Sequence, residues 1–418
     1  MFIGKDKALI SNMGNIKIHH LTYYSEKSHK FLYALFFLSF IASMNCWIGW
    51  AGRSFYINLF VTICSFFYIK KKNIKMDYSL RNVIAFCLFA IGQAFVIDND
   101  SRFLNYLNYF QVLFIICLND KDKVICINYI IKWMGWLLLI SIVVYFLYFL
   151  IALPSLGKVQ FSKVSYWVEN GYGICDNYIF YIRSKFEGYA MRFNGPFLEP
   201  GQLGMVLAFI LLICKFDINR KDVKIILLAI LLTLSLAGYM LSLIAFFLVL
   251  LINNRINKTN LIFVLLAIVL VYCYGAYWND GNNIINEKIL SRLQADDENG
   301  FFGNNRSFGM IDVYFVNMWY DTKTLLYGYP KNTIEWLAEN GSRGAGFVMW
   351  MVKYGLLGTI VSGIFYLYYM MTAENRKFAF LCFLFFVFMF WQRSYPFWTS
   401  WVICYVYGIT WDKYNNRN

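Results

Sequence analysis

Charged residues, prolines and histidines are scarce in this chain, and the shortage limits the kind of protein it can be. Only 15% of its 418 residues are charged whereas 60% are hydrophobic, and it has 5 prolines and 3 histidines. Soluble domains carry about 25% charged and roughly 45–50% apolar residues, and disordered chains carry fewer apolar residues still. The composition therefore argues against a soluble enzyme, a disordered protein or a fibrous protein. It predicts a polytopic membrane protein.

Metal-binding, disulfide and signal-peptide patterns are also missing from the sequence. The chain has 10 cysteines but no CxxC pair and no Cys/His cluster, which argues against structural zinc. Of these cysteines only Cys175 falls in a predicted outer loop, so we expect no disulfide framework. The first 30 residues are polar and lack a small-residue cleavage site, so we expect no removable signal peptide.

Apolar stretches of transmembrane length recur along the whole chain. A helix needs about 17–25 apolar residues to cross a bilayer, and fewer when it is strongly apolar. We predict twelve such stretches, at 30–50, 53–69, 81–97, 103–118, 124–153, 200–215, 223–236, 238–252, 261–279, 344–371, 377–392 and 395–411. This pattern predicts an all-α integral membrane protein in which residues 1–418 form a single polytopic domain.

The stretch from 223 to 252 is divided in two because Ser235-Leu-Ala-Gly238 interrupts it. Basic residues flank both of its outer ends, so we expect a hairpin of two short helices with both ends on the same side. The loops assigned to the inner side are 1–30, 70–81, 119–123, 215–224, 253–260, 372–377 and 412–418. These inner segments hold 22 of the 38 Lys and Arg residues but only 9 of the 24 acids.

The positive-inside rule then predicts that both termini are cytoplasmic. The formal net charge of +14 is therefore an orientation signal, and we expect no nucleic-acid partner.

Two outer segments are long, 154–199 and 280–343, and long loops are usually functional. The first is rich in aromatic rings, for which an interfacial belt is favoured over sugar stacking. These rings are Tyr166, Trp167, Tyr172, Tyr178, Tyr181 and Tyr189.

The first outer segment ends in a run that predicts an anion site. Gly195-Pro196 indicates a turn, and Pro200 suits the first turn of a following helix. The amino terminus of that helix, with its free N–H groups, would then lie beside Arg192 at the outer boundary of the membrane. Glu199 would lie near the N-cap, either as a capping carboxylate or as a catalytic group.

Arginine is the residue best suited to phosphate, because its planar fork is always charged and binds bidentately. Arg192, Arg306, Arg343 and Arg393 lie in or beside outer loops and could converge on one phosphate ligand, although each alone is typical of a surface ion pair. Lys353 is placed about 14 Å into its span at 1.5 Å per residue. It either extends to the interface or contacts a ligand in a polar cavity.

Several motifs resemble those of the Wzy-type O-antigen polymerases and the related O-antigen ligases. Arg192-Phe-Asn-Gly-Pro-Phe-Leu-Glu-Pro200 is similar to their arginine-glycine-proline signature, and Thr233-Leu-Ser-Leu-Ala-Gly238 is similar to their helix break. Arg306 followed by Leu326-Tyr-Gly-Tyr-Pro330 resembles the arginine and small-residue turn of their second loop. Gly355-Leu-Leu-Gly358 resembles the glycine-rich helix after it. The resemblance covers roughly residues 180–400.

The resemblance implies a GT-C-like membrane glycosyltransferase with two large periplasmic loops, in a bacterial inner membrane. It would join undecaprenyl-pyrophosphate-linked repeat units by moving the growing chain onto the non-reducing end of the incoming unit, without metal or cofactor. A chain-length regulator protein is an expected partner. The implied catalytic residues are Arg192, Glu199, Arg306 and Arg343. The implied substrate-binding residues are Lys353, Arg393, Glu339 and Tyr189.

Two alternatives are an O-antigen ligase and a flippase for lipid-linked oligosaccharides. The related ligases commonly carry a histidine near the end of the second outer loop, whereas this chain has only His19, His20 and His29, all expected in the cytoplasm. A flippase would need charged residues in many spans, and only Lys132 and Lys353 lie within the predicted spans. The sequence therefore favours the polymerase. Glu199 and Glu339 are the candidates for a base that deprotonates the acceptor.

Overall fold

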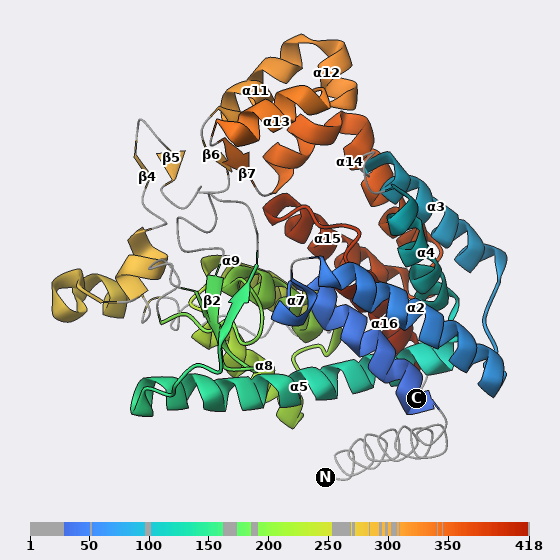
Figure 1. The fold of residues 1–418 in the computed structure, drawn as a ribbon, viewed down its shortest axis with the longest axis horizontal. Coiled ribbons are helices and arrows are strands. Elements are labelled where there is room, and N and C mark those ends of the chain that lie inside the picture. Colours follow the sequence, from blue (N-terminus) through green and yellow to red (C-terminus); the bar gives the residue numbers. More distant parts are fainter. Residues whose placement is uncertain are drawn as a thin grey trace, which may run out of the picture.

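The computed structural model describes most of the chain and is mostly helical (Figure 1). The described residues are 29–50, 52–96, 102–161, 174–184, 191–252, 310–340, 342–344 and 346–416, with short pieces between 269 and 308.

The helices coincide with the predicted apolar stretches. They are His29–Ser43, α2 (Arg53–Lys72), α3 (Leu80–Val96), α4 (Arg102–Cys117), α5 (Asp120–Ile151), α7 (Pro200–Ile213), α8 (Lys221–Leu232), α9 (Leu236–Ile252), α14 (Phe347–Met371), α15 (Arg376–Gln392) and α16 (Thr399–Asn416). In the stretch 261–279, residues 261–268 and 270–271 lie outside the described residues, and 272–277 are helical. By length and apolar composition, α5 and α14 can each cross a membrane, and His29–Ser43, α3, α7 and α9 are shorter apolar helices.

Helix α7 forms the centre of the bundle, and all its residues are buried. It packs against α8, α9, α15 and α16. The crossing with α9 is close because glycines face each other, so that a Cβ atom on Gly204 would lie 3.0 Å from the Cα of Gly238. The predicted division of the stretch into two helices is confirmed, with the break between α8 and α9 at Thr233–Ser235. Gly238 therefore lies inside α9 and serves the helix crossing.

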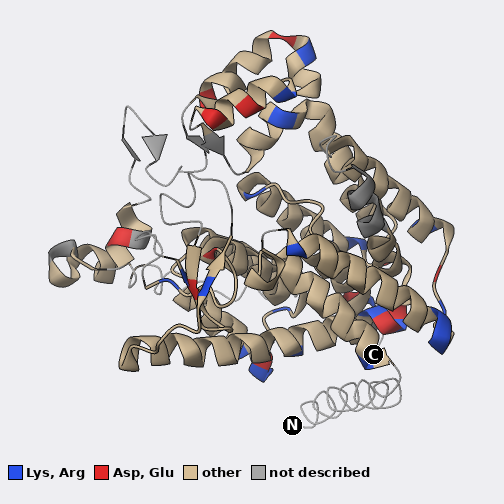
Figure 2. Cartoon of the chain, viewed as in Figure 1, with Lys and Arg blue, Asp and Glu red and all other residues tan. Residues whose placement is uncertain are grey.

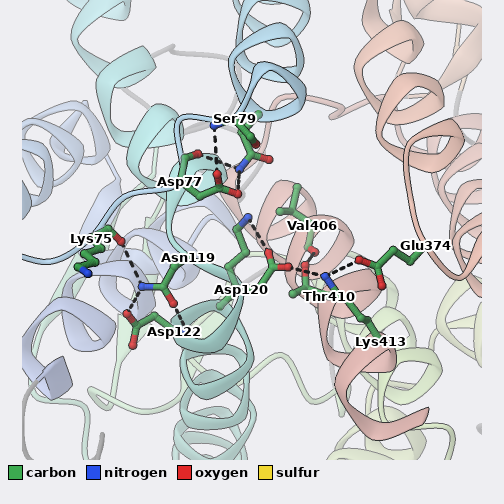
Figure 3. A network of polar contacts seen from close by, with 12 residues as sticks. Lys75, Asp77, Ser79, Asn119, Asp120, Asp122, Glu374, Val406, Thr410 and Lys413 are labelled. Carbon is green, nitrogen blue, oxygen red and sulfur yellow. Dashed lines mark hydrogen bonds and ion pairs between the residues drawn. The ribbon is translucent and has the colours of Figure 1, made fainter. Parts of the chain in front are cut away.

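Segments predicted to lie on the inner side meet at one end of the bundle (Figure 3). Lys413 Nζ lies 3.0 Å from Asp120 Oδ2 and 2.7 Å from Glu374 Oε1, and Lys123 lies 3.6 Å from Asp120. Lys215 Nζ lies 2.6 Å from Asp412 Oδ1. We call these six residues the inner charge cluster. Between the two ends, the helices carry few charged residues (Figure 2).

The first long outer segment contains a small antiparallel sheet, which the all-α expectation did not include. Its strands are β1 (Lys158–Gln160), β2 (Ile174–Asn177) and β3 (Ile182–Ser184), in the order β1-β2-β3. Beside it, Tyr178 and Tyr181 are buried against Tyr145 and Tyr148 of α5. These two rings therefore belong to the core, and neither the interfacial belt nor sugar stacking describes them.

The second long outer segment is also more regular than the sequence predicts. It contains α11 (Ile311–Asn317), η7 (Met318–Tyr320), α12 (Thr322–Tyr327) and α13 (Lys331–Glu339). Before them lie η4 (Trp278–Gly281), η5 (Asn286–Leu290) and the paired strands β4 (Ala295–Asp296) and β5 (Gly300–Phe301), and β6 (Ser307–Phe308) pairs with β7 (Arg343–Gly344). Ile311 and Leu337 pack with Val352 of α14, so α11–α13 cover the first turns of α14 (Figure 1).

Helix α14 is interrupted at Gly355, whose φ of 61° and ψ of −166° are open in practice only to glycine. The interruption accommodates the turn after α12, because a Cβ atom on Gly355 would lie 2.6 Å from the backbone nitrogen of Gly328. Tyr329 N–H donates to the Val352 carbonyl at 2.8 Å. The turn that the resemblance implies at 326–330 is therefore present only from Gly328 onward, since Leu326 and Tyr327 end helix α12.

Candidate functional site at the outer end of the bundle

The arginine-glycine-proline run is held by the break between α8 and α9. Phe193 N–H donates to the Leu232 carbonyl at 3.0 Å, and Arg192 Nε donates to the Thr233 carbonyl at 3.1 Å. Carbonyl groups at the end of a helix have no partner within that helix. The carbonyl groups of Leu232 and Thr233, at the end of α8, therefore hold Phe193 and the buried Arg192 in place.

The turn inside the run is fixed from several directions. Gly195 has a φ of 55°, and Asn194 Nδ2 donates to the Phe197 carbonyl at 2.6 Å. Trp47 N–H donates to the Pro196 carbonyl at 3.0 Å, and Leu198 N–H donates to the Asn45 carbonyl at 3.1 Å. These bonds attach the run to the residues that follow the first described helix. The predicted turn at Gly195-Pro196 is confirmed.

Glu199 is the N-cap residue of α7 and Pro200 is in its first turn, as predicted, but the Glu199 side chain does not cap the helix. It forms an ion pair with Arg393 Nη2 in the turn after α15. The capping interpretation of this carboxylate is therefore wrong. A guanidinium is a better partner than the helix N–H groups because it provides charge as well as donors.

Arg393 lies in the same corner as the helix break. A Cβ atom on Gly201 would lie 3.7 Å from Arg393 Nη2 and 3.5 Å from Ser235 Oγ. The guanidinium of Arg393 and the hydroxyl of Ser235 therefore both lie beside the first turn of α7. We call Arg192, Glu199, Ser235 and Arg393 the outer site. Guanidinium groups beside the amino terminus of a helix suit an anionic ligand.

The other predicted site residues are not all in this corner. Lys353 is half-buried two residues before the break in α14, and Glu339 is exposed at the end of α13. Within the described residues, no ion pair joins either of them to the outer site. Arg343 is placed by its backbone in β7, next to β6. Arg306 and Tyr189 lie outside the described residues.

A cavity of about 400 Å³ lies near the outer site, to which it is joined by the hydrogen bond between Asn45 of its lining and Gln202 in the first turn of α7. No motif of the sequence predicts it. Its lining includes Asn45, Asn58, Gln93, Trp398 and Thr399. Asn58 and Gln93 lie within the predicted apolar stretches 53–69 and 81–97, whose apolar character alone indicates no site. Amide side chains near the outer ends of α2 and α3 were the available signal, since polar groups in membrane helices are costly and usually functional.

Two titratable side chains of the outer segments, Cys175 and Asp321, have shifted pKa values that are explained by structural roles. Burial raises the pKa of the Cys175 thiol to about 12, so this cysteine is unreactive at neutral pH. Hydrogen bonds from Thr324 and Lys323 lower the pKa of Asp321, the N-cap residue of α12. Among the described residues, no three His, Cys, Asp or Glu side chains are grouped so that they could hold a metal ion.

Comparisons of this chain with protein-family models, with curated proteins and with solved structures found no match.

Proposed function

We propose that this chain is a membrane glycosyltransferase that polymerises lipid-linked oligosaccharide repeat units, as in the O-antigen polymerases that its motifs resemble. The observation that carries the proposal is the pairing of motifs distant in the sequence. The run Arg192–Pro200 is hydrogen-bonded to the break at Thr233, and Glu199 of that run is paired with Arg393.

The remaining two motifs are also paired in space. The turn at Gly328 lies against the break at Gly355, and Tyr329 is hydrogen-bonded to Val352. Each of the two pairings brings together motifs that are separate in the sequence, and this supports the resemblance.

In the proposed reaction, an acceptor hydroxyl oxygen attacks the anomeric carbon of the donor sugar. The bond from that carbon to the lipid pyrophosphate breaks, and the pyrophosphate leaves with the bonding electrons. Arg192 and Arg393 stabilise the charge that develops on it. The acceptor proton passes to a base, for which Glu199 is the carboxylate of the outer site. The proposal requires no metal ion or cofactor.

Arg343 is proposed as a further pyrophosphate ligand. A Cβ atom on Gly346 would lie 2.8 Å from the carbonyl oxygen of Gln392, the residue before Arg393. Arg343 is three residues before Gly346, and three residues of extended chain span at most about 11 Å. The chain connection therefore keeps Arg343 near the outer site. The role proposed for Arg306 rests on the resemblance alone.

The proposed environment is a bacterial inner membrane crossed by twelve helices, with both termini in the cytoplasm. The inner charge cluster would then face the cytoplasm and the outer site the periplasm, where a chain-length regulator is the proposed protein partner. Large apolar side chains exposed along α5, such as Trp136, Val143 and Leu150, support contact with lipid.

Deletion of the gene in its host, followed by electrophoresis of the lipopolysaccharide, tests the proposal. We expect core carrying a single repeat unit, because units are still made, flipped and ligated but no longer joined. Core without any repeat unit would indicate a ligase or a flippase instead. An unchanged ladder would contradict O-antigen polymerisation and direct the search to another polysaccharide.

A further inference from the structure

The cavity beside the outer site is lined by uncharged polar groups and aromatic rings. Its hydroxyl and amide side chains come from four elements near the outer end of the bundle: Ser43, Asn45, Ser54, Asn58, Gln93 and Thr399. Phe161, Phe397 and Trp398 provide half-buried rings. None of the residues that line the cavity is charged, so it suits a neutral ligand better than a phosphate.

The two asparagines of the lining are oriented by the protein itself. Ser39 Oγ donates to Asn58 Oδ1 at 2.8 Å, and Asn45 Nδ2 donates to Gln202 Oε1 at 3.0 Å. Each bond uses one end of an amide. The other ends, Nδ2 of Asn58 and Oδ1 of Asn45, remain a donor and an acceptor for a ligand.

The cavity is connected to the outer site through short stretches of chain. Gln202, the partner of Asn45, is in the first turn of α7, three residues after Glu199. Thr399 begins α16, six residues after Arg393. A ligand whose phosphate is bound by the arginines could therefore place its neighbouring groups in the cavity.

We infer that this cavity binds a neutral sugar ring of the lipid-linked substrate, with the amides bonding its hydroxyl groups and the aromatic rings facing its C–H surface. A volume of about 400 Å³ is within the range of small-molecule sites. Mixed donors and acceptors beside aromatic rings match a pyranose, which has hydroxyl groups at its rim and apolar faces. The identity of the ligand rests on the proposed function.

Saturation-transfer NMR with free sugars tests the inference on the purified full-length protein in lipid nanodiscs. The probes are glucose, galactose, mannose and N-acetylglucosamine, each added alone. The cavity variants are Asn58→Leu and Gln93→Met, which keep side-chain size but remove the hydrogen-bonding groups. Ser65→Ala is the matched control, because Ser65 is a buried polar residue of α2 outside the cavity.

We expect at least one of these sugars to bind the wild type and Ser65→Ala equally. Binding to Asn58→Leu and Gln93→Met should be roughly fivefold to tenfold weaker, as for the loss of one hydrogen bond. Equal binding to wild type and both cavity variants would overturn the inference, and so would the absence of binding by any of the four sugars.

The proposed function and this inference fail in different ways. If the gene deletion leaves single-unit lipopolysaccharide but no sugar binds the wild type, the polymerase stands and the sugar site is wrong. If the ladder is unchanged but sugar binding still depends on Asn58 and Gln93, the cavity is a sugar site in a protein of another function.

Discussion

The inner and outer ends of the bundle use the same ionic residue types in different ways. At the inner end, acidic and basic side chains bind one another directly, and the single ammonium group of Lys413 contacts both Asp120 and Glu374. At the outer end, Arg192 is bound to a backbone carbonyl at a helix break, and the Glu199–Arg393 pair lies close to a polar cavity.

From this difference we expect the ion pairs of the inner end to have a structural role and the arginines of the outer end to have a functional one. Ion pairs between helix ends fix how the helices meet and can be replaced at moderate cost. An arginine fixed through its backbone contact is oriented before any ligand arrives, which is what stabilisation of a transition state requires. Substitutions at the inner end should therefore change stability, whereas those at the outer end should change activity.

The largest difference is expected between Arg192→Ala and Arg220→Ala. Arg220 is an inner arginine that binds Asp222 and Asn128 at 2.6–3.1 Å. We expect Arg192→Ala to abolish polymer at a normal protein level, and Arg220→Ala to lower the protein level while leaving a full-length ladder. Complementation of the deletion strain, with electrophoresis and membrane immunoblots, measures both. Normal polymer from Arg192→Ala would remove this arginine from the mechanism.

A double-mutant comparison of Glu199 and Arg393 examines the outer ion pair. We expect Glu199→Gln to slow polymerisation roughly 100-fold, in the range for loss of a general base. Because the two residues act as a unit, Glu199→Gln with Arg393→Gln should be little worse than the more damaging single change. The rate is measured in nanodiscs with purified lipid-linked repeat units. Additive losses would show that the two side chains act independently.

Most helices could be predicted from the sequence, but the contacts of the site could not. Long apolar stretches indicate helices wherever they occur, and the break near Ser235 follows from small residues flanked by basic clusters. The pairing of Glu199 with Arg393 has no local signal, because the two residues lie in different outer turns far apart in sequence. The turn at Gly195 was predictable because glycine and proline act locally.

The outer helices and the cavity escaped prediction for a different reason. Helices α11, α12 and α13 have 7, 6 and 9 residues, which is too short for a clear hydrophobic period. They are stabilised by packing on α14, a contact that depends on the whole fold. Asn58 and Gln93 are single polar residues in apolar helices, and only the arrangement of four elements makes them neighbours.

A smaller effect, on stability, is expected from glycine substitutions in α14. Gly355→Ala forces a side chain into a conformation reserved for glycine and places its Cβ 2.5 Å from the Leu326 carbonyl oxygen. We expect a loss of about 1–3 kcal/mol. Gly363→Ala is the matched control, because a Cβ there meets nothing within 4 Å. Thermal unfolding in detergent should separate the two variants, and equal melting temperatures would contradict the close packing of α12 on α14.

The smallest effect on polymer is expected from Lys413→Met at the inner end. Lys413 is 20% exposed and its partners Asp120 and Glu374 are 25% and 49% exposed, so solvent weakens both ion pairs. We expect a loss of about 1 kcal/mol in stability and an unchanged ladder. Lys121→Met, at an exposed position of the same end, should change neither. Loss of polymer from Lys413→Met at a normal protein level would mean that the inner charge cluster also serves the reaction, since a purely structural ion pair could not produce that result.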